Sequence, residues 1–176
     1  MKKRALRVVL PAVIAIALVS YTLGQEIVAG RTPSLFSFAL INFSGYLFFL
    51  LMPVEALVPI YQAEGHAGAT LILIAVPTAV AAQVIDYCIG RAVSERVISN
   101  LIGEMRYMRF RDKIENWGGW VVLLFNLFPL ASSVLLLVAG MMRYSARRAL
   151  LYSLTGLVIK YCTIVYLFDL ASSWIA

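Results

Sequence analysis

Five long apolar stretches constrain the fold more than any other feature of the sequence. Each has between 18 and 27 residues, four contain no charged residue, and the fifth contains only Lys160. A helix that crosses about 30 Å of hydrocarbon at about 1.5 Å per residue needs about 20 apolar residues. Every stretch therefore has the length of a membrane-spanning helix. The stretches are Val8–Gln25, Thr32–Val54, Gly65–Ile85, Asn116–Met142 and Ala149–Phe168.

The composition excludes several other classes of protein. Apolar residues make up 62% of the 176 residues and charged residues 14%, whereas soluble domains average about 45–50% and about 25%. The two cysteines, Cys88 and Cys162, exclude a disulfide scaffold, and we expect them to be small buried thiols. No phosphate-binding loop, dinucleotide fingerprint or zinc-ligand spacing occurs. We therefore predict no enzymatic activity, no cofactor and no metal site.

The distribution of Lys and Arg between the stretches predicts how the chain crosses the membrane. Cytoplasmic loops carry an excess of these residues. Four precede the first stretch, six lie between Arg91 and Glu115, and three follow Met142, whereas Arg31 is alone in its loop. Five full spans would place the cluster of six outside. If the second and fourth stretches each enter and leave on one side, all 13 clustered residues and the N-terminus are cytoplasmic.

Prolines in these two stretches support such re-entrant hairpins. Pro53 ends the second stretch, and Pro129 lies in the middle of the fourth, between Asn126 and the Ser132-Ser133 pair. An interior proline removes a helical hydrogen bond, and nearby polar side chains can satisfy the freed backbone groups. Each arm of the fourth stretch has about 12 residues, which covers roughly half of the membrane core. The alternative for Pro129 is a simple kinked span.

We therefore predict an all-α integral membrane protein with about three full spanning helices and two inverted re-entrant helical hairpins that are broken at prolines. Broken helices at corresponding positions are typical of inverted repeats with a site near the membrane midplane. Residues 1–34 would form an N-terminal transmembrane helix and an external loop; the alternative for the first stretch is a secretory signal, for which residues 17–20 are a poor cleavage site. Residues 35–168 would form the membrane domain, and residues 169–176 a short C-terminal tail.

Three ionisable residues lie inside or at the ends of the apolar stretches. Such groups are costly in a membrane and are usually functional. Glu55 lies at the turn of the first hairpin, Asp86 ends the third stretch, and Lys160 lies deep in the last one. We expect Lys160 to pair with Glu55 or Asp86, and Asp86 to balance its charge; such a pair could also be purely structural. Small and polar residues extend two helical stripes that should face each other: Ser153, Gly156 and Thr163 with Lys160, and Ala79, Gln83 and Gly90 with Asp86.

The loop between the third and fourth stretches has the pattern of a membrane-surface segment. Apolar residues of 92–102 fall on one helical face, and Gly103 is a plausible stop. Residues 104–117 mix Arg with Met, Tyr and Phe, which is typical of an interfacial segment on anionic headgroups. Arg91 and Arg109 are the candidate headgroup-binding residues. Acidic residues in the same loop argue against a nucleic-acid site.

Several short motifs, in their order and spacing, resemble the DedA superfamily of VTT-domain membrane proteins. The resemblance covers about residues 35 to 168 and implies two opposed re-entrant hairpins. Family members are implicated in moving lipids between leaflets, and some are described as proton-dependent transporters. The motifs are Pro53-Val54-Glu55, Tyr87-Cys88-Ile89-Gly90-Arg91, Trp117-Gly118-Gly119-Trp120, Phe128-Pro129 and Ala139-Gly140-Met141-Met142.

The chain departs from the main DedA pattern at two positions. Where that branch carries arginines around the second-hairpin proline, this sequence has Asn126 and Ser132. Gly156 and Lys160-Tyr161 partly match the last helix of the shorter YqaA-type branch, which the chain resembles more closely. Lys160 could supply the positive charge that the missing arginines would have carried.

The predicted function is translocation or scrambling of a lipid or polyprenyl-phosphate headgroup between leaflets, with proton coupling as a further hypothesis. Glu55 would be the protonatable group, because burial disfavours a charged carboxylate. Lys160 and backbone N–H groups after Pro129 would hold a phosphate. The candidate site residues are Glu55, Asp86, Asn126, Pro129, Ser132, Ser133 and Lys160.

Two other classes of function remain open at this point. One is a proton-coupled secondary transporter of a small ion or solute, and the other is a scaffold that transports nothing. The expected partners are membrane lipids with anionic headgroups and, as an open alternative, further copies of the chain, but not nucleic acid. The expected location is the prokaryotic cell membrane, with the N-terminus in the cytoplasm.

The charge asymmetry predicts that the loops around Arg109 and Arg147 are both cytoplasmic. Single cysteines introduced in each loop, in a chain whose Cys88 and Cys162 are replaced by serine, should resist an impermeant thiol reagent added to intact cells. They should react once the cells are permeabilised. Strong labelling of either loop from outside would contradict the paired re-entrant arrangement.

Overall fold

All regular structure in the described part of the chain is helical. The computed structural model describes residues 34–47, 54–92, 103–127 and 132–175. The expected N-terminal span and both hairpin prolines, Pro53 and Pro129, lie outside these residues. The helices are α2 (Leu35–Gly45), the 3₁₀ turn η1 (Val54–Ala56), α3 (Leu57–Ala63), α4 (Gly68–Ala92), α6 (Glu104–Trp117), α7 (Gly119–Leu127), α8 (Ser132–Met141) and α9 (Ala146–Ile175).

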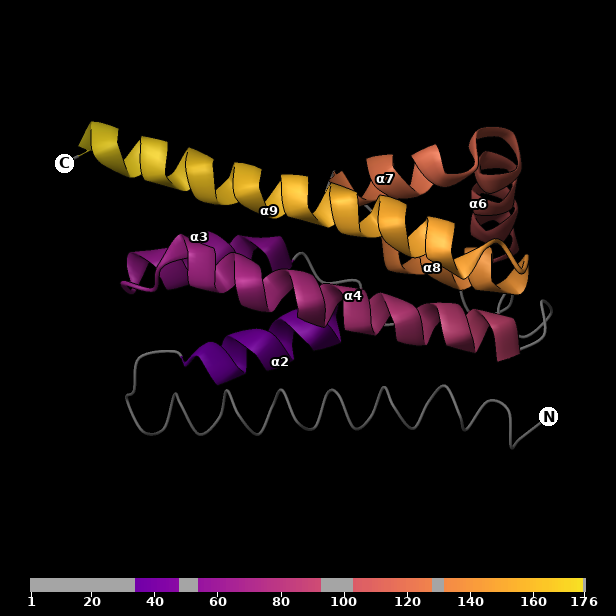
Figure 1. Cartoon of the computed structure of the whole chain (residues 1–176), viewed down its shortest axis with the longest axis horizontal. Coiled ribbons are helices and arrows are strands. Elements are labelled where there is room, and N and C mark those ends of the chain that lie inside the picture. The colour runs from indigo at the N-terminus through magenta and orange to yellow at the C-terminus, as the bar shows by residue number, and fades with distance from the viewer. Residues whose placement is uncertain (1–33, 48–53, 93–102, 128–131, 176) are drawn as a thin grey trace.

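Two long antiparallel helices, α4 and α9, run through the whole bundle (Figure 1). Within the described residues, these two are long and apolar enough to cross a membrane. Their antiparallel packing brings Gly68, at the start of α4, next to Val165, near the end of α9. Because α9 continues through Ile175, the expected tail after residue 168 is the last part of this helix.

Two pairs of short helices flank opposite halves of the long pair. Figure 1 shows α2 and α3 towards one end of α4 and α9, and α7 and α8 towards the other. In each half, a long helix follows a pair of short α-helices, α4 after α2 and α3 and α9 after α7 and α8. The first short helix of each pair packs on the long helix that follows it, α2 on α4 and α7 on α9.

The start of α2 is fixed by a local cap and by a contact to α3. Ser34 caps the helix, since its hydroxyl oxygen accepts a hydrogen bond from the Ser37 N–H at 3.2 Å. The Ser37 hydroxyl lies 2.8 Å from the Tyr61 hydroxyl. This buried contact ties the first turn of α2 to α3, so that the two short helices of the first pair stay together.

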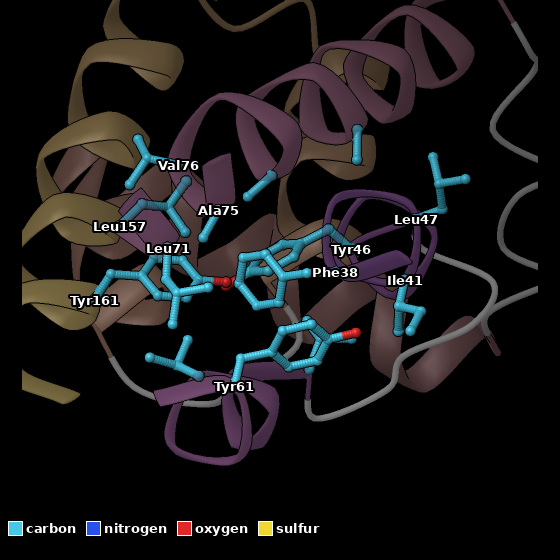
Figure 2. Packing of buried hydrophobic residues seen from close by; sticks show 14 residues of the cluster. Phe38, Ile41, Tyr46, Leu47, Tyr61, Leu71, Ala75, Val76, Leu157 and Tyr161 are labelled. Carbon is cyan, nitrogen blue, oxygen red and sulfur yellow. The ribbon is translucent and has the colours of Figure 1, made fainter. Parts of the chain in front are cut away.

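Apolar side chains form two separate clusters along the bundle. Figure 2 shows the first cluster, with the rings of Phe38, Tyr46, Tyr61 and Tyr161 gathered in its middle. Its buried residues are Phe38, Ile41, Tyr46, Leu47, Val54, Val58, Tyr61, Leu71, Ala75, Val76, Ala79, Ala82, Leu157 and Tyr161. Those of the second cluster are Tyr87, Tyr107, Phe110, Ile114, Val121, Val122, Val134, Leu135, Leu136, Val138, Ala139 and Ala149.

Helix α6 runs across the end of the bundle, at a steep angle to α4 and α9 (Figure 1). Tyr107, Phe110 and Ile114 are buried on one face at helical spacing and join the second cluster. Gly103 precedes the helix with a φ of 89°, a left-handed conformation that favours glycine. The segment predicted to be interfacial is thus an amphipathic helix. The helical face expected over residues 92–102, which Gly103 was expected to end, lies outside the described residues from residue 93 onwards.

Helices α4 and α8 approach each other more closely than side chains normally permit. A Cβ atom on Gly90 of α4 would overlap the carbonyl oxygen of Leu137, and one on Gly140 of α8 would overlap that of Tyr87. Small residues at a helix crossing allow such close packing in membrane proteins. The crossing explains why Gly90, a member of the predicted stripe on α4, is buried.

Gly90→Val should destabilise the protein by about 3 kcal/mol, because the new side chain must force two backbones apart. Thermal unfolding in detergent micelles measures this effect. Ala81→Val, which places the same side chain on the exposed face of α4, is the matched control and should change stability little. Equal unfolding temperatures for both variants would contradict the close crossing.

Candidate functional site

A buried ion pair joins the first pair of short helices to the last long helix. The Nζ of Lys160, in α9, lies 2.7 Å from Oε1 of Glu55, in η1. The Lys160 side chain is 4% exposed and that of Glu55 is 15% exposed, so the pair is largely shielded from the surroundings. A buried charge is strongly unfavourable without a partner, and each residue provides that partner for the other.

Two tyrosines surround this ion pair. The Tyr46 hydroxyl donates a hydrogen bond to Glu55 Oε1 at 3.0 Å, and the Tyr161 hydroxyl lies 3.3 Å from that of Tyr46. The Lys160 ammonium lies 5.2 Å from the ring centroid of Tyr46 and 5.8 Å from that of Tyr161. Both separations fall within the range of cation–π attraction. The cation is therefore held by a carboxylate and by two aromatic faces.

Asn42 connects the tyrosines to α4. Its amide Nδ2 donates hydrogen bonds to the Ala75 carbonyl oxygen at 2.9 Å and to Thr78 Oγ1 at 2.8 Å. These bonds fix the orientation of the amide, and its Oδ1 accepts a hydrogen bond from the Tyr161 hydroxyl at 2.7 Å. A continuous set of polar contacts therefore runs from Glu55, through Tyr46 and Tyr161, to α4.

A second polar network lies between the two apolar clusters. Gln83 of α4 donates from Nε2 to Asn126 Oδ1 at 2.6 Å, and Asn126 Nδ2 donates to the Val122 carbonyl oxygen at 2.8 Å. Ser153 of α9 donates its hydroxyl hydrogen to Gln83 Oε1. Because these residues come from α4, α7 and α9, the network holds three helices together where apolar packing is interrupted.

Of the two acids predicted as partners of Lys160, Glu55 makes the contact, so the expectation that Asp86 balances the charge of Lys160 is wrong. Asp86 is fully buried in α4, one helical turn after Gln83, at the level of the second network. It lies beyond Ala82, the last α4 residue of the first cluster, and directly before Tyr87 of the second, whereas the neighbours Leu157 and Tyr161 of Lys160 belong to the first.

The other predicted site residues are spread over several elements. Ser132 and Ser133 are the first two residues of α8, and Asn126 belongs to the second network. Arg91 and Arg109 are exposed, as expected for residues that contact headgroups. Pro129 is outside the described residues.

Two smaller expectations about the long helices are wrong. Thr163 is exposed and donates its hydroxyl hydrogen to the Ile159 carbonyl oxygen of its own helix, although Ser153, Gly156 and Lys160 of its stripe are buried. Cys88 and Cys162 are exposed rather than buried. Each cysteine lies two positions after the buried charged residue of its helix, and two positions along a helix turn a side chain by about 200° to the opposite side.

The sequence analysis assigned no role in the site to Asn42, Tyr46 or Tyr161. A repeated segment in the sequence could have pointed to Tyr161. Residues 84–88 read Val-Ile-Asp-Tyr-Cys and residues 158–162 read Val-Ile-Lys-Tyr-Cys. The two segments differ only at Asp86 and Lys160, and in both the tyrosine is buried and its hydroxyl binds another segment. Tyr87 donates to the Tyr144 carbonyl oxygen at 2.6 Å, and Tyr161 donates to Asn42.

A comparison with known families identifies the family of the chain. The family model described as the VTT domain matches residues 37–170. The chain belongs to the VTT-domain family. This match confirms the predicted DedA resemblance, while the assignment to the YqaA-type branch stays a prediction. No curated protein and no solved structure matches the chain significantly.

Membership of the VTT-domain family fits the apolar helices. VTT-domain proteins are generally membrane-associated, are proposed to act as transporters or flippases, and are generally regarded as non-enzymatic. Together with the two helices that are long enough to cross a membrane, this indicates a membrane protein. No group of three His, Cys, Asp or Glu side chains within the described ranges could hold a metal ion.

The buried ion pair of the VTT domain predicts a specific pattern of stability. Lys160→Met should destabilise the protein by about 3–5 kcal/mol, because Glu55 is then buried without its cation. Adding Glu55→Gln should restore part of that loss. Adding Asp86→Asn instead should restore none of it, since Asp86 is not the partner of Lys160.

Thermal unfolding of the three variants in detergent checks this pattern. The exposed pair of Arg111 and Glu115 in α6, whose side chains are 41% and 47% exposed, supplies the control. Glu115→Gln should change stability by less than about 1 kcal/mol. If the Lys160→Met variant unfolds at the same temperature as the unmodified protein, the lysine reaches the membrane surface and the pair is dispensable for stability.

Proposed function

We propose that this VTT-domain protein moves a phosphate-bearing lipid headgroup between the leaflets of the membrane. The observation that carries the proposal is the Glu55–Lys160 pair, a largely buried charge pair between a short-helix segment and a spanning helix. Ionisable residues inside membrane proteins mark the pathways of substrates and ions. Lys160 is the candidate contact for the phosphate.

The proposed topology places the two pairs of short helices as opposed re-entrant hairpins. The repeated order of two short helices and one long helix supports this topology, as does the equivalence of Asp86 and Lys160 in the repeated segments. In this arrangement the N-terminus and the basic clusters face the cytoplasm of a prokaryotic cell. Anionic lipids of that membrane are the proposed partners.

The proposed mechanism is an exchange of partners at Lys160. While Glu55 is ionised, its carboxylate is paired with the Lys160 ammonium and accepts a hydrogen bond from the Tyr46 hydroxyl. Protonation of Glu55 would remove the negative charge and leave the ammonium for a headgroup phosphate. Proton uptake would thus be coupled to headgroup binding through competition for one cation.

The second network would form the next part of the path. Asn126 and Ser153 lie beside Gln83 between the apolar clusters, and seven residues of helix separate Ser153 from Lys160, or about 10 Å. We assign Asp86, Pro129, Ser132 and Ser133 to this part of the path. Polar groups at both levels would allow a headgroup to pass without complete desolvation.

Lipid movement can be measured in liposomes that contain the purified protein and a trace of tail-labelled fluorescent phosphatidylglycerol, with dithionite added outside. Active protein should let dithionite bleach more than the outer-leaflet half of the label. Lys160→Met should abolish this effect, and Glu55→Gln should make lipid movement insensitive to pH. Glu115→Gln, the same chemical change at an exposed site, should behave like the unmodified protein.

The outcomes separate the proposed function from its rivals. A Lys160→Met variant that is folded and moves lipid at the normal rate would overturn the proposal. Unmodified protein that leaves the label in place but carries protons down a gradient would be a transporter of a small ion or solute. Protein that does neither would be a scaffold.

A further inference from the structure

An open pocket lies away from the ion pair, between the beginnings of α7 and α9. Its volume is about 440 Å³. Aromatic and leucine side chains form most of its wall, and one arginine contributes a charge. The lining residues are Trp120, Leu123, Tyr144, Arg148, Leu151, Tyr152 and Thr155.

The pocket walls are held in place by close packing. Gly119 leaves room for the Tyr152 ring, which a Cβ atom at position 119 would overlap. The rings of Trp120 and Tyr152 pack with their centroids 5.7 Å apart. The Tyr144 backbone is fixed by the hydrogen bond that its carbonyl oxygen accepts from Tyr87. Gly119 and Trp120, the last two residues of the Trp-Gly-Gly-Trp motif, thus form one side of the pocket.

The electrostatic character of the pocket selects an anion. Arg148 is exposed, and the ion pairs of the described residues do not include it. Arg143 and Arg147 lie nearby in sequence, and no carboxylate lines the pocket. A guanidinium with unused donors is well suited to a phosphate, which it can bind with two parallel hydrogen bonds.

Along α9, the pocket wall passes from the charged Arg148 to the apolar Leu151, about one turn away. Beyond it, the Thr155 hydroxyl donates to the Leu151 carbonyl oxygen of its own helix, and Leu123 of α7 adds a further apolar side chain to the wall. Trp120, a lining residue, is 61% exposed, as is common for tryptophans at the level of lipid headgroups. A phospholipid has the same order of groups: a charged head and then an acyl chain.

We infer that this pocket binds one anionic phospholipid, with the headgroup phosphate on Arg148 and the first part of an acyl chain against Leu123 and Leu151. The aromatic rings of Trp120 and Tyr152 would pack beside the glycerol region. The site is separate from the Glu55–Lys160 pair and binds lipid at equilibrium. Its occupation does not depend on whether the protein transports anything.

Quenching of Trp120 by brominated lipids tests this site directly. Trp117→Phe and Trp174→Phe remove the other two tryptophans, whose side chains are 66% and 83% exposed. The full chain is placed in nanodiscs that contain phosphatidylglycerol or phosphatidylcholine with brominated acyl chains. Phosphatidylglycerol should be preferred at Trp120 by about fivefold, the factor expected for one basic residue that acts on an anionic headgroup.

Two neighbouring arginines provide the matched comparison. Arg148→Gln should abolish the preference for phosphatidylglycerol, and Arg148→Lys should retain part of it. Arg147→Gln removes the same charge one residue away, outside the pocket, and should leave the preference intact. Because the tested arginines are exposed, these variants should fold normally, which their unfolding temperatures will verify.

Four results would overturn the inference. Equal quenching by the two lipids would mean that the pocket does not select an anion. Equal losses in Arg147→Gln and Arg148→Gln would mean that the surface charge, and not the pocket, attracts the lipid. Loss of the preference for phosphatidylglycerol when inorganic phosphate is added would assign Arg148 to a free anion. No quenching by either lipid would mean that no acyl chain lies beside Trp120. None of these results bears on lipid movement through the Glu55–Lys160 site.

Discussion

A lysine in the middle of an apolar helix requires an acid within reach, and this requirement determines how the first half of the domain is arranged. Glu55 comes from a short 3₁₀ turn that is 105 residues away in the sequence. To reach Lys160, the first pair of short helices must pack against the distal half of α9. Tyr46 and Asn42 then extend the contact to α4. One electrostatic constraint therefore brings α2, η1, α4 and α9 together.

The segments around Asp86 in α4 and Lys160 in α9 have the same sequence except at the charged residue. Both tyrosines are buried and both cysteines are exposed, so the two helices present the same faces to the interior. Only the charge differs, negative in α4 and positive in α9. The two helices therefore bury opposite charges at corresponding positions, each followed by a buried tyrosine.

Hydropathy and charge counting could predict that the chain is helical and which polar stripes are buried. Both of these features depend on how residues are spaced along a single helix. Gln83, Asp86, Gly90, Ser153, Gly156 and Lys160 are buried as expected. The sequence could not show which acid reaches Lys160, since that depends on how distant helices pack. It also gave no reason to select Asn42 or Tyr46, because a tyrosine or asparagine in an apolar stretch is common. The family was predictable because the motifs keep a fixed order along the chain.

The glycine crossing of α4 and α8 also has a mechanical consequence. With backbone against backbone at Gly90 and Gly140, neither helix can rotate or slide without breaking van der Waals contact, so the two behave as one rigid lever. The Tyr152 ring, packed on Gly119, holds α9 against α7 through a side chain. The contact between these two pairs of helices is largely that of α4 with α9, where Ser153 donates a hydrogen bond to Gln83. A relative movement of the two pairs would therefore act mainly as shear of α4 against α9.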